Sequence, residues 1–384
     1  MELKLDTSKK YALALGGGGA KGGYEVGAWA AFEEAGIRFS AVSGTSVGAL
    51  NGAMVAMGDV NAGKSVWENI RYSQVMDVDD ALMDKLLHGA FKELDLRATA
   101  DMVKDIFSRG GIDVKPLYDW MKSVVDEECV RRSDTELFIV TYSIRAKKEL
   151  ELRAKDLPDG MLCDMLLASA YLPVFHSEKL EGKFADGGVK DVLPLHVLFE
   201  HGYRDILAVH VHGFGRERRV RIPEDAKVYT VAPTADLGST LEFTAEQSRF
   251  NLRAGYFDAM KLLYGLKGRK WYLDAQWDEK AAYDYLCGGI SHFLTTSGKN
   301  FTMRELHEKY IPAAAKVLEV KSPDYRDVLL AYLEEAARET GLEQFQVYSE
   351  DGLVQRLGST ACPEKVCRSF DAPKGLKKIA TIFD

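Results

Sequence analysis

The chain has 384 residues, a length that fits one large domain or one domain with an appendage. Hydrophobic residues make up 46% and charged residues 28%, a balance that excludes a disordered or fibrous protein. The 58 acidic side chains outnumber the 50 basic ones, so the formal net charge is −8. A protein that binds nucleic acid needs a basic face, and we therefore expect no nucleic-acid partner.

The sequence contains no signal for secretion or membrane insertion. The first ten residues, MELKLDTSKK, carry charges but no apolar segment, and no run reaches the roughly 18 apolar residues of a spanning helix. The odd number of scattered cysteines does not indicate a disulfide framework. Cys362 and Cys367 are close in sequence, but no second Cys or His pair completes a zinc site. We expect reduced thiols, no metal, and a cytoplasmic protein with at most peripheral membrane contact.

The first 57 residues predict the opening of a parallel α/β sheet. Residues 11–15 form an apolar run that ends in glycines, which is typical of a buried strand. Residues 24–35 have apolar side chains at helical spacing and stop at Gly36. A second strand over 37–42 then turns sharply into a helix over 47–57. This alternation of strand and helix favours an α/β fold.

Later segments continue the alternation until the character of the chain changes near residue 239. We predict strands over 136–143, 149–153, 183–185, 205–211 and 227–232, and helices over 160–171 and 194–200. Beyond these, helical patterns dominate, over 241–266 and 324–340. We expect a catalytic domain over 1–275 and a mainly helical C-terminal extension over 276–384. The apolar stripes of the two long helices fit ordinary packing better than an acyl-chain groove or a membrane-facing surface.

A charged, helical-looking segment over 77–111 interrupts the early sheet. It has two interpretations, a cap over a site or a surface insertion. We favour the insertion, because most surface helices do not cover a site.

Gly44-Thr45-Ser46-Val47-Gly48 matches the pattern G-x-S-x-G between a predicted strand and a predicted helix. A turn this tight leaves no room for side chains beside the serine, so glycine flanks it and the hydroxyl is exposed at the end of the sheet. Ser46 is therefore a candidate nucleophile. The alternative is an ordinary glycine turn with a capping serine.

The glycine-rich segment 17–22 follows the first predicted strand and has three possible uses. A dinucleotide-binding loop needs an acidic residue at the end of the second strand, and residues 37–43 contain none. A phosphate-binding P-loop needs a closing Gly-Lys-Ser/Thr, which is also missing. The remaining use is an oxyanion hole, in which successive glycine amides face developing negative charge.

A serine nucleophile needs a base, and the sequence offers two kinds. Among eight histidines, only His210 and His212 lie near the end of a predicted strand, and an ordinary surface or core imidazole is the simpler interpretation for each. Asp186 follows a short strand and precedes Gly187 and Gly188, which allow a close approach to the serine. An Asp-Gly turn is the alternative for that carboxylate.

Taken together, these segments resemble the patatin-like phospholipases. Residues 17–22, 44–48 and 186–188 occur in the family's order, and a fourth block, 168–175, precedes the aspartate. The resemblance covers about residues 10–233. Lys21 stands where arginine is commoner in the family, and Gly188 where alanine often occurs.

The resemblance implies a three-layer α/β/α fold and a serine–aspartate dyad that hydrolyses acyl esters of lipids without histidine. In this chain Ser46 would be the nucleophile and Asp186 the base. The remaining site residues are the oxyanion-hole amides of Gly17, Gly18 and Gly19 and the supporting glycines Gly22, Gly44, Gly48, Gly187 and Gly188. We expect a phospholipase A or esterase that needs no cofactor, with a lipid or ester substrate and transient contact with membrane surfaces.

Two rival functions remain open at the level of sequence. The first is a Ser–Asp–His hydrolase in which His210 or His212 is the base and Asp186 orients it; a nucleophile on the second strand is early for that fold. The second is a non-catalytic protein that keeps the fold and binds partners through its C-terminal part. The intact serine, aspartate and glycine loop argue against it.

Overall fold

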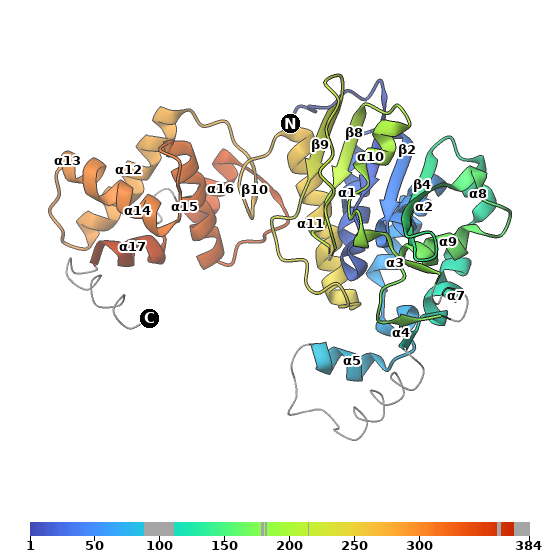
Figure 1. Ribbon diagram of the computed structural model, residues 1–384. Coiled ribbons are helices and arrows are strands. Elements are labelled where there is room, and N and C mark those ends of the chain that lie inside the picture. Colours follow the sequence, from blue (N-terminus) through green and yellow to red (C-terminus); the bar gives the residue numbers. More distant parts are fainter. Residues whose placement is uncertain (88–110, 178–179, 181–182, 214, 359–361, 372–384) are drawn as a thin grey trace. The chain divides into compact units, whose positions relative to one another are not determined.

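The computed structural model describes residues 1–87, 111–177, 180, 183–213, 215–358 and 362–371 (Figure 1). These residues form two compact units, one over Glu2–Tyr264 and one over Gly265–Asp384. Most of the segment that the sequence presents as a cap or insertion, from residue 88 to 110, lies outside the described residues.

A mostly parallel sheet of seven strands forms the centre of the first unit. Its order is β5-β4-β2-β1-β8-β9, with β7 also paired to β4. β1, β2, β4, β8 and β9 run parallel, whereas β5 and β7 are antiparallel to β4. The strands are β1 (Lys10–Leu15), β2 (Arg38–Thr45), β4 (Glu136–Ser143), β5 (Lys148–Arg153), β7 (Phe184–Asp186), β8 (Asp205–Val209) and β9 (Lys227–Val231). The predicted α/β class is confirmed.

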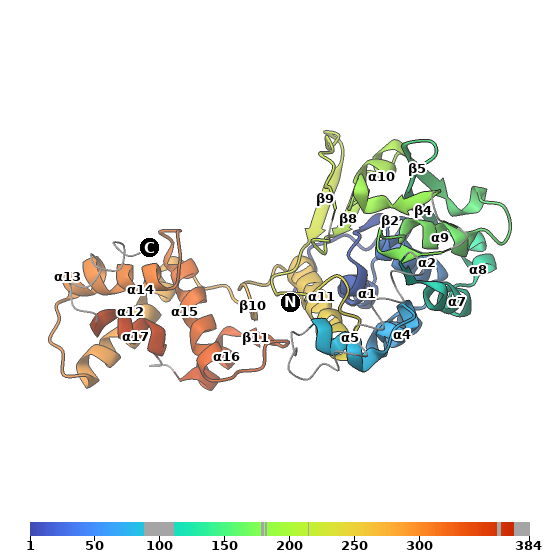
Figure 2. The ribbon, with the colours of Figure 1, turned by 60° about the horizontal axis from the view of Figure 1, so that its bottom comes forward.

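Helices cover both faces of this sheet (Figure 2). On one face α10 (Leu195–Glu200) packs Val197 and Leu198 against alanines of β1 and β2. On the other face lie α1 (Gly22–Glu34), α2 (Val47–Met57) and α11 (Ala245–Tyr264). Because the central strands are covered on both sides, β1 is an unbroken apolar run rather than an alternating one.

Shorter elements complete the first unit. Its remaining helices are α3 (Val60–Glu68), α4 (Tyr72–Val75), α5 (Asp80–Leu87), α7 (Lys115–Val124), α8 (Glu127–Arg132) and α9 (Leu162–Ser169), with 3-10 turns at Gly19–Lys21, Ala154–Asp156 and Gly187–Val189. A separate pair of two-residue strands, β3 (Ile112–Asp113) and β6 (Phe175–His176), runs parallel. The sequence did not predict this pair, because two residues are too few to show a periodic pattern.

The second unit is mainly helical, as the sequence predicts. It contains α12 (Glu279–Thr296), α13 (Met303–Glu305), a π-helical segment (Leu306–Tyr310), α14 (Ile311–Val317), α15 (Tyr325–Glu339), α16 (Glu350–Leu357) and α17 (Glu364–Asp371). The apolar stripe of α15, including Leu329 and Tyr332, is buried in the core of this unit, so it serves packing. A two-stranded parallel sheet, β10 (Tyr272–Asp274) with β11 (Val347–Ser349), was not predicted.

None of the described helices combines the length with the apolar character that crossing a membrane requires.

Two glycines set the distance between α1 and α11. A Cβ on Gly27 would lie 2.0 Å from the Leu252 carbonyl oxygen, and one on Gly255 would lie 1.8 Å from that of Tyr24. Neither contact is possible, so only glycine allows the two backbones to pack this closely.

We therefore predict that Gly27→Ala destabilises the first unit by about 1–3 kcal/mol, the usual range for overpacking. The matched control is Gly288→Ala in α12, where an added Cβ meets no atom within 4 Å and helix propensity favours alanine. Thermal unfolding of both variants measures the difference. An unchanged unfolding temperature in Gly27→Ala would contradict the prediction, because it would show that α1 and α11 can move apart without a loss in the free energy of unfolding.

Candidate functional site

Ser46 lies on a sharp turn between β2 and α2. Its φ of 56° is in the left-handed region, which a residue with a side chain adopts only when its surroundings hold it there. A Cβ on Gly44 would lie 2.2 Å from the Gly48 carbonyl oxygen, and one on Gly48 would lie 2.5 Å from that of Leu15. Both flanking positions therefore require glycine, as the G-x-S-x-G spacing predicts.

Ser169 holds the backbone of this turn in place. Its hydroxyl accepts a hydrogen bond from the Ser46 amide at 2.8 Å and donates one to the Val140 carbonyl at 2.6 Å. Ser169 ends α9 and is fully buried. Sequence reasoning gave it no role, although it lies within the block 168–175 that carries part of the family resemblance.

Asp186 is at the end of β7, where that strand pairs with β4 beside Thr141. Its Oδ1 accepts the Gly188 amide at 2.7 Å, and its side chain is almost entirely buried. A Cβ on Gly187 would lie 2.4 Å from the Val140 carbonyl oxygen, so glycine is required directly after the aspartate. Asp186 and Gly187 therefore do form a turn, and this turn places the carboxylate inside the protein.

Burial raises the pKa of Asp186 to about 6, although hydrogen bonds from the Ser46 side chain and the Gly188 amide oppose the shift. The structure thus brings together the two side chains that the sequence proposes as nucleophile and base. With this pKa the carboxylate is ionised at neutral pH but is a stronger base than an ordinary aspartate.

The glycine loop after β1 lies against Ser46. A Cβ on Gly17 would lie 3.3 Å from that of Ser46. The Gly17 amide donates to the Val192 carbonyl at 2.9 Å, so it is not available to an oxyanion, contrary to the prediction for that residue. The amides of Gly18 and Gly19 make no hydrogen bond to another described residue. Gly19 has a φ of 57°, and a Cβ there would lie 2.3 Å from the Thr240 carbonyl oxygen.

The two histidines of the rival hydrolase mechanism face each other. Nδ1 of His210 accepts the His212 amide at 2.9 Å, and Nε2 lies 3.3 Å from a carboxylate oxygen of Glu217. The two rings lie 4.2 Å apart. Both nitrogens of His210 are therefore engaged, and no hydrogen bond among the described residues joins either ring to Ser46 or Asp186.

An apolar pocket opens beside Ser46. The side chains that line it come from several helices and from the segment before α11, and they include Leu50, Trp67, Ile70, Leu117, Met121 and Phe243. The Trp67 indole nitrogen donates to Asn51 at 2.9 Å, which fixes one wall of the pocket. A pocket with this lining suits a hydrocarbon chain.

The first unit is thus an α/β protein in which a serine on a strand-to-helix turn lies next to a buried carboxylate and a glycine loop. Residues 13–199 match the family model described as Patatin-like phospholipase. This segment of the chain therefore belongs to the patatin-like phospholipase family.

Individual proteins show more limited similarity. Lysophospholipase nte1 from Aspergillus terreus is 52% identical over 48 residues, which are 12% of this chain and only 3% of that protein. The structure of VipD from Legionella pneumophila matches with a TM-score of 0.42 and 15% identity, covering 95% of this chain and 92% of VipD. The structure of ExoU from Pseudomonas aeruginosa, in its complex with SpcU, matches with a TM-score of 0.33 and 15% identity, covering 94% of this chain and 76% of the ExoU complex's matched chain.

We predict that Ser169→Ala lowers kcat on the order of tenfold and leaves KM nearly unchanged. The substitution leaves the buried Ser46 amide and Val140 carbonyl without partners, which costs about 1–3 kcal/mol and lets the Ser46 hydroxyl shift. Steady-state ester hydrolysis by the two proteins measures the effect. The control is Ser40→Ala, which removes another serine-to-carbonyl hydrogen bond on β2. Equal losses in both variants would indicate general destabilisation instead.

Proposed function

We propose that this chain is a serine hydrolase that cleaves acyl esters of lipids, of the phospholipase A or esterase type. The observation that carries the proposal is the buried Asp186 carboxylate, with its raised pKa, beside the Ser46 hydroxyl at an apolar pocket. The family of residues 13–199 and the lysophospholipase relative support a lipid substrate.

The reaction begins with proton transfer from Ser46 to Asp186. Oδ1 of that carboxylate is held by Gly188, and Oδ2 makes no regular hydrogen bond among the described residues, so Oδ2 is the oxygen we assign as base. As the proton leaves, Ser46 Oγ attacks the ester carbonyl and the carbonyl oxygen becomes an oxyanion. The amides of Gly18 and Gly19 donate to this oxygen.

Collapse of the tetrahedral intermediate releases the alcohol, which takes the proton back from Asp186, and leaves an acyl group on Ser46. The same carboxylate then removes a proton from water, whose oxygen attacks the acyl carbon. The second intermediate releases the fatty acid and restores the serine. Each carboxylate proton is returned within its half-reaction, so the cycle needs no other titrating group.

The apolar pocket supplies the preference for lipids. Burial of a hydrocarbon chain against Leu50, Ile70 and Met121 stabilises the complex by about 0.8 kcal/mol for each methylene removed from water. A substrate of this kind resides in membranes or micelles, so we propose that the protein contacts lipid surfaces transiently.

The test is fatty-acid release from mixed phospholipid vesicles. We predict that Ser46→Ala and Asp186→Asn each lower the rate by about 10³-fold or more, because each removes a group that acts in the transition state. Asp159→Asn, a fully exposed aspartate that also precedes a glycine, and the exposed Ser65→Ala are matched controls. Wild-type activity in Asp186→Asn would exclude the dyad. Equal release from Ser46→Ala and wild type would indicate another nucleophile.

The raised pKa of Asp186 also predicts the pH dependence of activity. The base must be ionised, so kcat/KM should fall below a pKa of about 6 rather than near the ordinary 3.9 of aspartate. The pH–rate profile of the wild-type protein measures this limb. Activity that persists unchanged down to pH 4.5 would contradict the assignment.

The contribution of Asp186 to the stability of the folded protein should depend on pH in the direction opposite to that of activity. A carboxyl group whose pKa is raised by folding stabilises the protein below its unfolded value, and this contribution is lost as the pH rises through about 6. A shift of about two pKa units corresponds to about 3 kcal/mol. At pH 8, Asp186→Asn should therefore be inactive but no less stable in urea than wild type. A large loss of stability there would mean that its inactivity reflects unfolding.

A further inference from the structure

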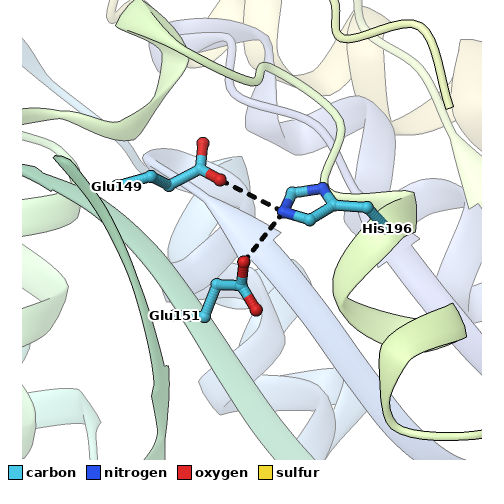
Figure 3. Close-up of side chains that lie close together, drawn as sticks. All are labelled: Glu149, Glu151 and His196. Carbon is cyan, nitrogen blue, oxygen red and sulfur yellow. Dashed lines mark hydrogen bonds and ion pairs between the residues drawn. The ribbon is translucent and has the colours of Figure 1, made fainter.

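Outside the proposed catalytic site, two glutamates and a histidine converge at the edge of the sheet (Figure 3). Glu149 and Glu151 are two residues apart on β5, so both side chains point to the same face of the strand. His196 is the second residue of α10, which covers that face. The imidazole is almost fully buried, and the two carboxylates are partly exposed.

The distances between these groups suit a metal ion. Nε2 of His196 lies 3.1 Å from Oε1 of Glu149 and 3.2 Å from Oε1 of Glu151. A single N–H group can serve both acceptors only through a bifurcated hydrogen bond, which is weaker to each of them than a linear one. Ligands of a tetrahedral zinc ion at about 2.0–2.1 Å lie about 3.3 Å from one another, close to both measured separations.

The other side of the imidazole carries a second, independent feature. Nδ1 lies 2.9 Å from Oδ2 of Asp191, a carboxylate with no exposed surface. A carboxylate behind the second nitrogen is the usual partner of a metal-ligating histidine, because it fixes the ring and its tautomer. Both atoms are buried, and neither makes a hydrogen bond of regular geometry within the described residues.

The charges also favour a cation. The carboxylates of Glu149, Glu151 and Asp191 carry three negative charges, and Arg218 contributes one positive charge through a contact of 3.2 Å with Glu149. The net charge of these four side chains is therefore −2, and a divalent ion bound by a neutral imidazole would cancel it. The rival state holds a proton on the imidazole in place of an ion. One negative charge then remains uncompensated.

We propose that Glu149, Glu151 and His196 bind a divalent transition-metal ion of the zinc class, with water completing the coordination. Asp191 is a positioning residue that orients His196. The ion would join the edge strand β5 to α10 and to the segment between Asp186 and that helix, so its role is structural. This differs from the sequence-based expectation of no metal, and it does not depend on the proposed hydrolase activity.

The experiment measures zinc binding to the full chain after treatment with a chelator, by equilibrium dialysis and elemental analysis. We expect one zinc per chain at micromolar free metal, and a rise in the unfolding temperature on zinc addition. His196→Gln and Glu151→Gln should abolish stoichiometric binding, and Asp191→Asn should weaken it by about 10- to 100-fold. The control is Glu217→Gln, which alters another glutamate–histidine pair.

A measurement on wild-type protein keeps the proposal testable if a variant fails to fold. The cobalt-substituted protein should show the intense visible absorption of a tetrahedral ion, and zinc should remove it. Ordinary adventitious sites bind zinc on the order of 100 micromolar. If wild type takes up no zinc at that free concentration, the proposal is overturned, and His196 is instead paired with the carboxylates as a protonated imidazole. Equal uptake by wild type, His196→Gln and Glu151→Gln would also overturn it, because the zinc would then lie elsewhere.

Discussion

The structure of the first unit depends on one close backbone contact, between the end of β1 and the start of α2. The turn at Ser46 brings Gly48 so near to the Leu15 carbonyl that no side chain fits between them. This contact holds Ser46 at a positive φ and places its hydroxyl beside the glycine loop that continues β1. Ser46 and the loop are thus positioned by neighbouring parallel strands, whose carboxyl ends meet at the same edge.

A second segment, between Asp186 and α10, is held to the same strands. The hydroxyl of Thr45 donates to the Asp191 carbonyl and that of Ser43 to the Pro194 carbonyl, both at 3.0 Å. In return, the Val192 carbonyl accepts the Gly17 amide. The segment therefore connects Asp186, the glycine loop and the strand before Ser46, and a shift in any one of them would disturb the other two.

The sequence predicts the elements that are long or that have strict local requirements. The first two strands and helices are confirmed, because continuous apolar runs and tight glycine turns are local signals. Asp186 was a candidate partner for Ser46 because it follows a short strand and precedes two glycines, and the family resemblance made the pairing specific although 140 positions separate the two residues along the chain. Ser169 and the occupied Gly17 amide were missed because a hydrogen bond between distant segments leaves no periodic trace. The same holds for the cluster around His196, which forms only when β5 meets α10.

Two buried carboxylates near the glycine loop show that burial, rather than the residue type, sets the direction of a pKa shift. Burial raises the pKa of Glu25 well above its usual value, and hydrogen bonds from Asn51 and the Gly16 amide offset only part of this. The pKa shifts of Glu25 and Asp186 therefore have the same direction and the same main cause, the removal of water from around a buried carboxylate. Asn51 also binds the Trp67 indole, so the group that neighbours Glu25 fixes the wall of the apolar pocket as well.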